Sequence, residues 1–312
     1  MWLKEFGGPE VLVPGEAPDP VSGEGQVLVA VEFVNITFVE TQVRAGSGPG
    51  PVRVELPVVP GNGVGGVVAA VGPGVDGGFV GRRVVSSTGG SGGYAELAVV
   101  DAAGVFEVPD GLALDDAVAL LADGRTATMM LHAARPRPGE RVLVEAAAGG
   151  VGTLLVQLAK AAGATVVAAA GGARKGEVAL GLGADEAVDY GLPGWGRKVG
   201  EVDVVFDGVG GEVGREAFTL VRAGGRMVSF GLASGEWAGV SEEDAAGRGV
   251  TLVKPKATAE ELREFTRSAL GAAAAGRLRP VIGQRFPLDG AADAHRAIQS
   301  RATVGKTLLE VR

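Results

Sequence analysis

Apolar runs alternate with helically spaced segments through the middle of the chain, from about residue 119 to residue 254. Arg141–Ala146 is a short strand pattern, and from Val151 onward apolar residues recur at helical spacing. Gly163 is a helix stop signal, and Ala164–Ala170 is a second buried strand. This repetition predicts a parallel, doubly wound sheet with right-handed crossovers. Further buried strands, each ending at glycines, are expected at Val202–Phe206 and Arg226–Phe230.

The two ends of the chain have a different pattern, in which glycine and proline separate short strands, as in a barrel. Residues 1 to about 118 are β-rich, with strand patterns at Gln26–Phe33, Gly66–Val71, Arg83–Ser86 and Tyr94–Val100. Helical patterns follow at Leu112–Leu121 and Thr126–Ala134. The tail is predicted to contain a helix at Ala259–Ala275, a β-like segment at Val281–Phe286, a helix at Gly290–Ser300 and a last strand at Lys306–Val311. On pattern alone, this tail could complete either of the two domains that 312 residues suggest.

A glycine turn lies directly between the strand at Arg141–Ala146 and the helix that follows it. Gly149 would let the backbone approach phosphates, and Gly152 would let the helix lie close to the strand. The helix would then point its free N–H groups and positive dipole end at an anion. Ala147 takes the place of the usual first glycine, so the motif is imperfect. The unit predicts a cradle for a dinucleotide pyrophosphate, with an ordinary βαβ turn as the alternative.

The segment after the second strand indicates the type of dinucleotide. An NAD site usually carries an acidic residue about 20 residues past the glycines, to bind the ribose 2′-OH. Here no acidic residue lies between Ala164 and Gly176, and the strand is followed by Gly171, Gly172, Ala173, Arg174 and Lys175. The two basic side chains could pair with a 2′-phosphate, which an acid would repel. We therefore expect NADPH rather than NADH, although Arg174 and Lys175 could also be solvated residues that open the next helix.

Net charge and composition limit the kinds of partner and the location that we expect for this protein. The net charge of −8 argues against a nucleic-acid partner. Leu56–Val75 carries no charge, but its prolines and glycines make a membrane helix an unfavourable interpretation. No secretory signal pattern is visible after Met1, so we expect a cytoplasmic protein.

The chain has no cysteine, which excludes disulfides, iron–sulfur sites and a thiolate nucleophile. Its two histidines, His132 and His295, lie far apart and neither has a spaced partner. A catalytic zinc is therefore not expected, and both histidines are interpreted as surface or helix-packing residues. No metal is predicted.

Several segments together resemble the zinc-independent quinone oxidoreductase (zeta-crystallin-like) branch of the medium-chain dehydrogenase/reductase superfamily. The resemblance extends over nearly the whole chain and includes Leu56–Gly61, Gly65–Val75, Gly92–Glu96, Gly124–Ala127, Pro138–Val144, Ala146–Gly152, Gln157–Lys160, Leu182–Asp185, Asp189–Tyr190, Val228–Gly231, Gly283–Leu288 and Ala294–His295. It implies an α/β chain with a GroES-like β-barrel catalytic domain, residues 1–118 and 255–312, and a Rossmann NADPH-binding domain, residues 119–254. It also implies NADPH in the cleft between them and a homodimer formed by edge pairing of Rossmann sheets.

The resemblance also assigns cofactor contacts. It implies phosphate contacts at Gly150 and Val151, within the turn that Gly149 and Gly152 bound. The 2′-phosphate and adenosine end is implied at Gly171, Gly172, Arg174, Lys175 and Tyr190. Tyr190 could stack its ring on adenine, or it could be a half-buried tyrosine at a strand end. Further contacts from later strands and from the tail are implied at Val209, Gly231, Ala233, Ser234 and Arg301. Thr126 is implied beside the nicotinamide. Arg301 could instead be a solvated residue at a helix end.

The chain departs from the family at the expected substrate site. Thr37 stands where an asparagine is usual, Glu40 replaces an aspartate, and Gln42 stands where some relatives carry tyrosine. Thr37 keeps a hydroxyl donor but loses the amide fork. Gly61-Asn62-Gly63 replaces the Gly-His-Glu of zinc-dependent relatives. Arg125 replaces an apolar residue and would attract a polar or anionic substrate if it faced the cleft, but would have no role if it faced outward.

These residues favour reduction of an acceptor that needs no strong acid. A ketone reductase requires an acid or a metal to stabilise the developing alkoxide, and neither is evident. A quinone, or an alkene conjugated to a carbonyl, spreads the incoming charge and can take its proton from water. We therefore expect NADPH-dependent quinone reduction, with Thr37 and Thr126 as weak polar positioners. Reduction of an activated alkene and NADPH binding with little catalysis are the alternatives.

Overall fold

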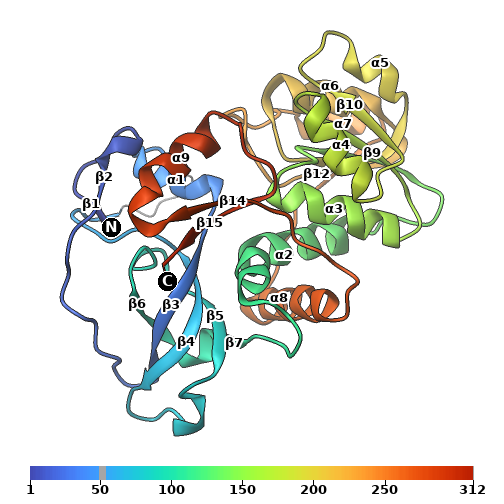
Figure 1. Cartoon of the computed structure of the whole chain (residues 1–312). Coiled ribbons are helices and arrows are strands. Elements are labelled where there is room, and N and C mark those ends of the chain that lie inside the picture. Colours follow the sequence, from blue (N-terminus) through green and yellow to red (C-terminus); the bar gives the residue numbers. More distant parts are fainter. Residues whose placement is uncertain (49–53, 312) are drawn as a thin grey trace. The chain divides into compact units, whose positions relative to one another are not determined.

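The computed structural model describes residues 1–48 and 54–311, and it divides into two compact units (Figure 1). Unit 1 comprises Met1–Ala122 and Leu270–Arg312, and unit 2 comprises Asp123–Ala269. Both chain crossings between the units fall inside helices, α2 (Leu114–Ala134) and α8 (Ala259–Ala274). Within the described ranges, no helix has the length and apolar character needed to cross a membrane.

Unit 2 contains the predicted parallel sheet. Its strand order is β10-β9-β8-β11-β12-β13, and all five neighbouring pairs are parallel. The strands are β8 (Arg141–Glu145), β9 (Thr165–Ala170), β10 (Glu186–Asp189), β11 (Val202–Asp207), β12 (Val221–Ser229) and β13 (Thr251–Val253). The order reverses direction between β8 and β11, which makes this the switch point where open α/β sheets bind ligands. The predicted doubly wound sheet is thereby confirmed.

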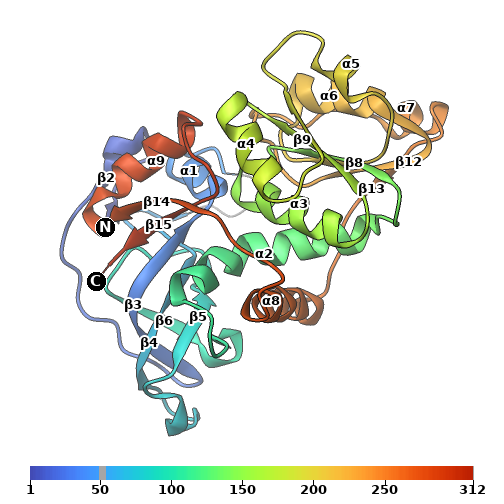
Figure 2. The same ribbon diagram turned by 45° about the vertical axis from the view of Figure 1, so that its right-hand side comes forward.

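Helices cover both faces of this sheet, as Figure 2 shows. They are α3 (Gly150–Ala161), α4 (Ala173–Gly181), α5 (Trp195–Val199), α6 (Gly211–Leu220) and α7 (Glu242–Gly247). One face of the sheet, including Leu143, Val205 and Met227, forms a core with α5, α6 and α7. Because both faces are covered, β8, β9 and β11 each contain a short uninterrupted apolar run, and these runs predicted the strands.

Two elements of this region differ from their sequence patterns. The helical patterns at Leu112–Leu121 and Thr126–Ala134 belong to a single helix, α2, that continues through Gly124. A buried glycine is tolerated inside a helix when packing of the helix outweighs its propensity cost of about 1 kcal/mol. β12 begins at Val221, five residues before the expected start at Arg226, and its pairing with β11 shifts register in the extra segment.

Unit 1 is built on a mostly antiparallel seven-stranded sheet of order β14-β15-β3-β4-β5-β7, with β6 also paired to β3. Its strands are β3 (Gln26–Ile36), β4 (Gly63–Val71), β5 (Arg83–Ser87), β6 (Leu97–Asp101), β7 (Phe106–Glu107), β14 (Ile282–Pro287) and β15 (Lys306–Glu310), beside a small sheet of β1 (Trp2–Leu3) and β2 (Leu12–Val13). The helices α1 (Phe38–Arg44) and α9 (Ala291–Gln299) also belong to this unit. The tail therefore completes the first unit through β14 and β15, which the sequence pattern left open.

The core of unit 1 contains a buried polar pair among its apolar side chains. Tyr94 is fully buried, and its hydroxyl lies 2.8 Å from Nε2 of His295 on α9. Burial lowers the pKa of His295 from 6.5 to about 3, so this imidazole is neutral in the fold. His295 is thus a helix-packing residue, as expected, and His132 on α2 is exposed. Tyr94 itself precedes β6 rather than beginning it.

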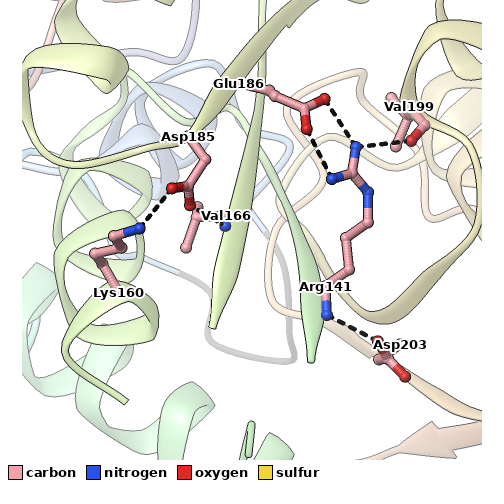
Figure 3. A network of polar contacts seen from close by, with 7 residues as sticks. All are labelled: Arg141, Lys160, Val166, Asp185, Glu186, Val199 and Asp203. Atoms are coloured by element: carbon pink, nitrogen blue, oxygen red, sulfur yellow. Dashed lines mark hydrogen bonds and ion pairs between the residues drawn. The ribbon is translucent and has the colours of Figure 1, made fainter. Parts of the chain in front are cut away.

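A polar network ties the amino-terminal ends of β8, β9 and β10 together (Figure 3). Arg141 binds both carboxylate oxygens of Glu186 at 2.8 Å and the carbonyl of Val199 at 3.0 Å. Asp185 pairs with Lys160 at 2.5 Å and accepts the N–H of Val166 at 2.8 Å. This edge of the sheet is therefore closed by ion pairs, and the opposite, carboxyl-terminal edge carries the glycine turns.

Candidate functional site

The carboxyl-terminal ends of five neighbouring strands bring together most of the predicted cofactor residues. β8 leads into the glycine turn at residues 146–150, and β9 leads into the glycines before α4. β10, β11 and β12 end at three further turns of the same edge. The residues gathered here are Gly149, Gly150, Val151, Gly152, Gly171, Gly172, Arg174, Lys175, Tyr190, Val209, Gly231, Ala233 and Ser234.

The turn between β8 and α3 is shaped by backbone alone. Ala146 has a left-handed φ of 46°, and Gly149 is the N-terminal cap of α3 without a side-chain cap. A Cβ on Gly152 would overlap the carbonyl oxygen of Ala146 and lie 2.8 Å from its carbon. Only glycine allows this approach of helix and turn. The first N–H groups of α3 lack acceptors within the helix, which suits them to bind an anion.

Ala147, the residue that replaces the usual first glycine, is completely buried behind this turn. Its N–H donates to the carbonyl of Ala169 in the adjacent strand at 3.1 Å, so this peptide is part of the sheet connection. The departure from the glycine motif therefore places a methyl group in the core. The turn keeps its form with alanine at this position.

The next turn supplies an aromatic ring and basic side chains. Tyr190 lies over Gly171, because a Cβ on that glycine would be 3.5 Å from the tyrosine ring. Gly172 has a φ of 89° and caps α4, where Arg174 is exposed and Lys175 is half-buried. Asp189 lies near this ring in sequence, but its carboxylate accepts the N–H of Gly191 at 2.8 Å. This rim, formed by Tyr190, Arg174 and Lys175, therefore carries an aromatic ring and two cationic side chains.

Glu145 and Asp207 form a buried carboxyl pair at the same strand ends. No sequence motif had pointed to this pair. Both are completely buried, at the ends of β8 and β11. Burial, and then the neighbouring Asp207 carboxyl, raise the pKa of Glu145 well above its ordinary value. Glu145 lies one residue before the end of the predicted strand Arg141–Ala146, and Asp207 directly follows the predicted strand Val202–Phe206, so an acidic residue at each of these strand ends was an available signal.

The predicted substrate residues of unit 1 lie at the start of α1. Glu40 accepts the N–H of Thr37 at 2.6 Å and its hydroxyl at 2.8 Å, and it also accepts the N–H of Asn62 at 3.0 Å. Burial raises the pKa of Glu40 despite these hydrogen bonds. The hydroxyl hydrogen of Thr37, expected to be a donor for substrate, is thus engaged with Glu40. Gln42 has a buried Oε1 with no hydrogen-bond partner among the described residues.

Two further predicted residues, Arg125 and Thr126, are half-buried on α2. Burial lowers the pKa of Arg125, and the nearby Asp123 carboxylate acts in the opposite direction. The Asp123 carboxyl also lies against Gly150, where its Cγ would be 3.0 Å from an added Cβ. An acidic side chain beside the first residue of α3 favours the helix dipole. Arg301 lies in unit 1 after α9, exposed and with a left-handed φ of 56°.

Two cavities lie away from these residues. One, of about 1030 Å³ in unit 1, is lined by residues such as Met1 and Trp2, and one, of about 410 Å³ in unit 2, by residues such as His132 and Phe265. Neither is lined by a predicted site residue. In the described portion of the chain, no three His, Cys, Asp or Glu side chains gather in a way that could hold a metal ion.

Comparisons with known proteins agree with this arrangement. The family described as "Alcohol dehydrogenase GroES-like domain" matches residues 23–110, and "Zinc-binding dehydrogenase" matches residues 182–309. The quinone oxidoreductase of Pseudomonas aeruginosa is 34% identical to this chain and covers 97% of both chains. A 2-haloacrylate reductase of Burkholderia is 33% identical over 98% of this chain and 97% of its own length.

Solved structures give the same result. The Escherichia coli quinone oxidoreductase complexed with NADPH matches with a TM-score of 0.90, 31% identity and 99% coverage of both chains. The expected pairing of a GroES-like domain with a Rossmann-type parallel sheet is confirmed by this match. The chain belongs to the quinone oxidoreductase branch of the medium-chain dehydrogenase/reductase superfamily.

Proposed function

We propose that this protein is an NADPH-dependent oxidoreductase that transfers hydride to a quinone. The observation that carries the proposal is the carboxyl-terminal edge of the unit 2 sheet. There, a turn that requires Gly152 lies in the same sheet edge as a rim bearing Arg174 and Lys175. The relatives of this chain include quinone oxidoreductases, one of them solved in complex with NADPH, which supports the same activity here.

The residues at this edge fit NADPH. The first N–H groups of α3, from Gly150 onward, would bind the pyrophosphate. The ring of Tyr190 would stack on adenine, and Arg174 and Lys175 would pair with the 2′-phosphate. Val209, Gly231, Ala233 and Ser234 from the later turns, Thr126 from α2 and Arg301 from unit 1 are proposed as further contacts.

NADPH, when bound, supplies the hydride. The protein then has to bind the acceptor, orient it and exclude water. We propose Thr37 and Thr126 as weak polar contacts to the acceptor, with Glu40 holding Thr37 through its two hydrogen bonds. Gln42 and Arg125 are proposed as further substrate contacts. A quinone suits such a site because its ring spreads the incoming charge.

The cofactor assignment is tested by NADPH and NADH affinities of an Arg174→Ala, Lys175→Ala double variant. Each charge-assisted contact is worth about 1.5–3 kcal/mol, so NADPH affinity should fall at least about tenfold while NADH affinity hardly changes. Arg197→Ala with Lys198→Ala is the matched control, because this pair is exposed on α5, next to Val199 of the opposite sheet edge. Equal losses for both cofactors would contradict the assignment.

The activity is tested by NADPH oxidation over a panel of quinones, enals and enones, with NADH as the control. Fast oxidation with quinones supports the proposal. NADPH binding without oxidation of any acceptor would instead indicate a nucleotide-binding protein with little catalysis.

Reduction of an activated carbon–carbon double bond is the second candidate, favoured by the similarity to a 2-haloacrylate reductase. The same site could serve both reactions, because each acceptor spreads the incoming charge over a carbonyl group. Deuteride transferred from labelled NADPH into the β-carbon of the product would identify alkene reduction. Quinone reduction leaves no such carbon-bound label.

We also propose a homodimer and a cytoplasmic location. β13 is an outer strand of the unit 2 sheet, and an outer strand has unpaired backbone groups that a second copy could use. Sedimentation analysis would show a species of twice the mass of one chain, and cell fractionation would test the location. A monomer at micromolar concentration would contradict the dimer.

A further inference from the structure

Glu145 and Asp207 connect three strand ends beneath the proposed cofactor site. Glu145 Oε2 accepts the N–H of Val209 at 3.2 Å. Asp207 Oδ1 accepts the N–H groups of Val209 at 3.2 Å and Gly210 at 2.7 Å, and Oδ2 accepts the hydroxyl of Ser229 at 2.8 Å. The two carboxyls thus hold the turn at residues 208–210 between β8, β11 and β12.

The turn at residues 208–210 is in direct contact with the turn at residues 231–235, which follows β12. Ser234 donates its N–H to the carbonyl of Val209 at 2.8 Å, and Ala233 donates to that of Gly208 at 3.3 Å. A Cβ on Gly231 would lie 2.6 Å from the same Gly208 carbonyl, so the two turns pack without room for a side chain. A shift of the 208–210 turn would therefore displace the residues proposed to contact NADPH.

The pair requires a proton. Two fully buried carboxylates that face each other repel strongly, and one of them then keeps its proton. Glu145 Oε1 is buried and, as an acceptor, has no hydrogen-bond partner in the described parts of the chain. A proton on this oxygen would make it a donor to Asp207, which already accepts three hydrogen bonds as a carboxylate. Asp207 is the titratable group that the described contacts place against Glu145. The other groups that contact the pair are the backbone N–H groups of the turn and the Ser229 hydroxyl, which donates to Asp207.

We propose that Glu145 and Asp207 are positioning residues of the NADPH site that share one proton, and that loss of this proton displaces the 208–210 turn and weakens NADPH binding. The inference rests on the proposed function for the location of NADPH. No bond to the cofactor is involved: the proton leaves to solvent, and the added negative charge stands at the edge that would bind the anionic pyrophosphate.

The test is the dissociation constant of NADPH, measured by fluorescence titration from neutral to alkaline pH. In the wild-type protein the constant should rise by up to tenfold per pH unit once the pair loses its proton. Glu145→Gln keeps a donor toward Asp207 and an acceptor for Val209, so it should bind NADPH as the wild type does at neutral pH and remain unchanged at alkaline pH. Glu145→Ala should bind weakly throughout. Glu212→Gln removes an exposed carboxylate from the first turn of α6 and should leave the wild-type profile intact.

The unfolding equilibrium of the cofactor-free protein provides a second measurement. Because the pKa of Glu145 is raised in the fold, the folded state binds more protons than the unfolded state above pH 4.5, and stability is lost as pH rises toward the folded pKa. In the wild type the unfolding equilibrium constant should therefore rise by up to tenfold per pH unit. This rise should be absent in Glu145→Gln. Identical pH profiles for wild type and Glu145→Gln in both measurements would overturn the proposal, as would a Glu145→Gln variant as weak as Glu145→Ala. If the wild-type protein bound no NADPH but its stability still depended more steeply on pH than that of Glu145→Gln, the proposed function would be rejected, whereas the shared proton would be supported.

Discussion

Replacing Gly152 by alanine should damage the proposed phosphate cradle, because α3 and the preceding turn are in contact at this position. The added methyl would overlap the carbonyl oxygen of Ala146 and lie 2.8 Å from its carbon and 2.9 Å from Cα of Ala147. Carbon atoms at van der Waals contact are about 3.5–4.0 Å apart. The helix must therefore move by several tenths of an ångström or more, and all three obstructing atoms belong to backbone that cannot rotate away.

The size of the effect follows from this overlap. Adding a methylene to a closely packed site typically costs about 1–3 kcal/mol, and Gly152 is buried against the sheet. If half of that strain is expressed as displaced N–H groups in the first turn of α3, NADPH affinity should fall about twofold to tenfold, since 1.4 kcal/mol corresponds to a factor of ten. Both the unfolding free energy and the affinity should decrease.

Urea denaturation and NADPH fluorescence titration measure the two quantities. The matched control is Gly181→Ala at the exposed end of α4, where an added Cβ has no heavy atom within 4 Å among the described residues. Alanine there should leave NADPH affinity unchanged and raise stability by about 0.4–1 kcal/mol. A Gly152→Ala variant with wild-type affinity and with the stability of the Gly181→Ala variant would refute the reasoning about close approach.

Three further predictions concern other parts of the molecule. Lowering the pH from 6.5 to about 3 should reduce the unfolding free energy by up to about 1.4 kcal/mol per pH unit, because His295 is neutral in the folded state and protonated in the unfolded state. Urea denaturation should show that the unfolding free energy of His295→Gln depends less steeply on pH. Arg141→Lys should lower the unfolding free energy by about 1 kcal/mol, because it loses the two-point contact with Glu186. Arg267→Lys, at an exposed position of α8, should change the unfolding free energy little. Thr37→Val should lower kcat/KM for quinone about twofold to tenfold, the worth of one neutral hydrogen bond, and an unchanged kcat/KM would remove Thr37 from the site.

The parts of the structure that the sequence predicted are those encoded by short segments. β8, the turn and α3 follow one another within residues 141–161, and their order alone defines the turn. The same holds for β9 and the basic residues after it. Gly152 could be assigned a packing role because helix and strand are adjacent in sequence, so their approach depends on few residues.

The parts that escaped prediction depend on residues far apart in the chain. Glu145 and Val209 are 64 residues apart, and only the strand order brings β11 beside β8. Tyr94 and His295 are 201 residues apart and meet because the tail returns to the first unit. No local pattern contains these distances, so neither pair could be read from spacing.

Thr37 and Glu40 are an intermediate case. The spacing Thr-x-x-Glu before an apolar segment is the signature of a helix capping box, and α1 begins in this way. That pattern would have predicted that Glu40 engages the backbone N–H of Thr37. It would not have predicted the further contact of Glu40 with Asn62, which comes from the turn before β4.

The difference between backbone and side-chain contacts explains which departures from the family sequence the proposed site can tolerate. The proposed cradle would bind with backbone N–H groups, so alanine at position 147 is acceptable as long as its methyl group faces the core, where it is fully buried. Discrimination between NADPH and NADH is proposed to depend instead on Arg174, which is exposed, and Lys175, which is half-buried. Substitutions in the cradle should therefore change affinity for both cofactors together, whereas substitutions in the rim should change their ratio. The two classes of variant can be told apart in a single titration series with NADPH and NADH.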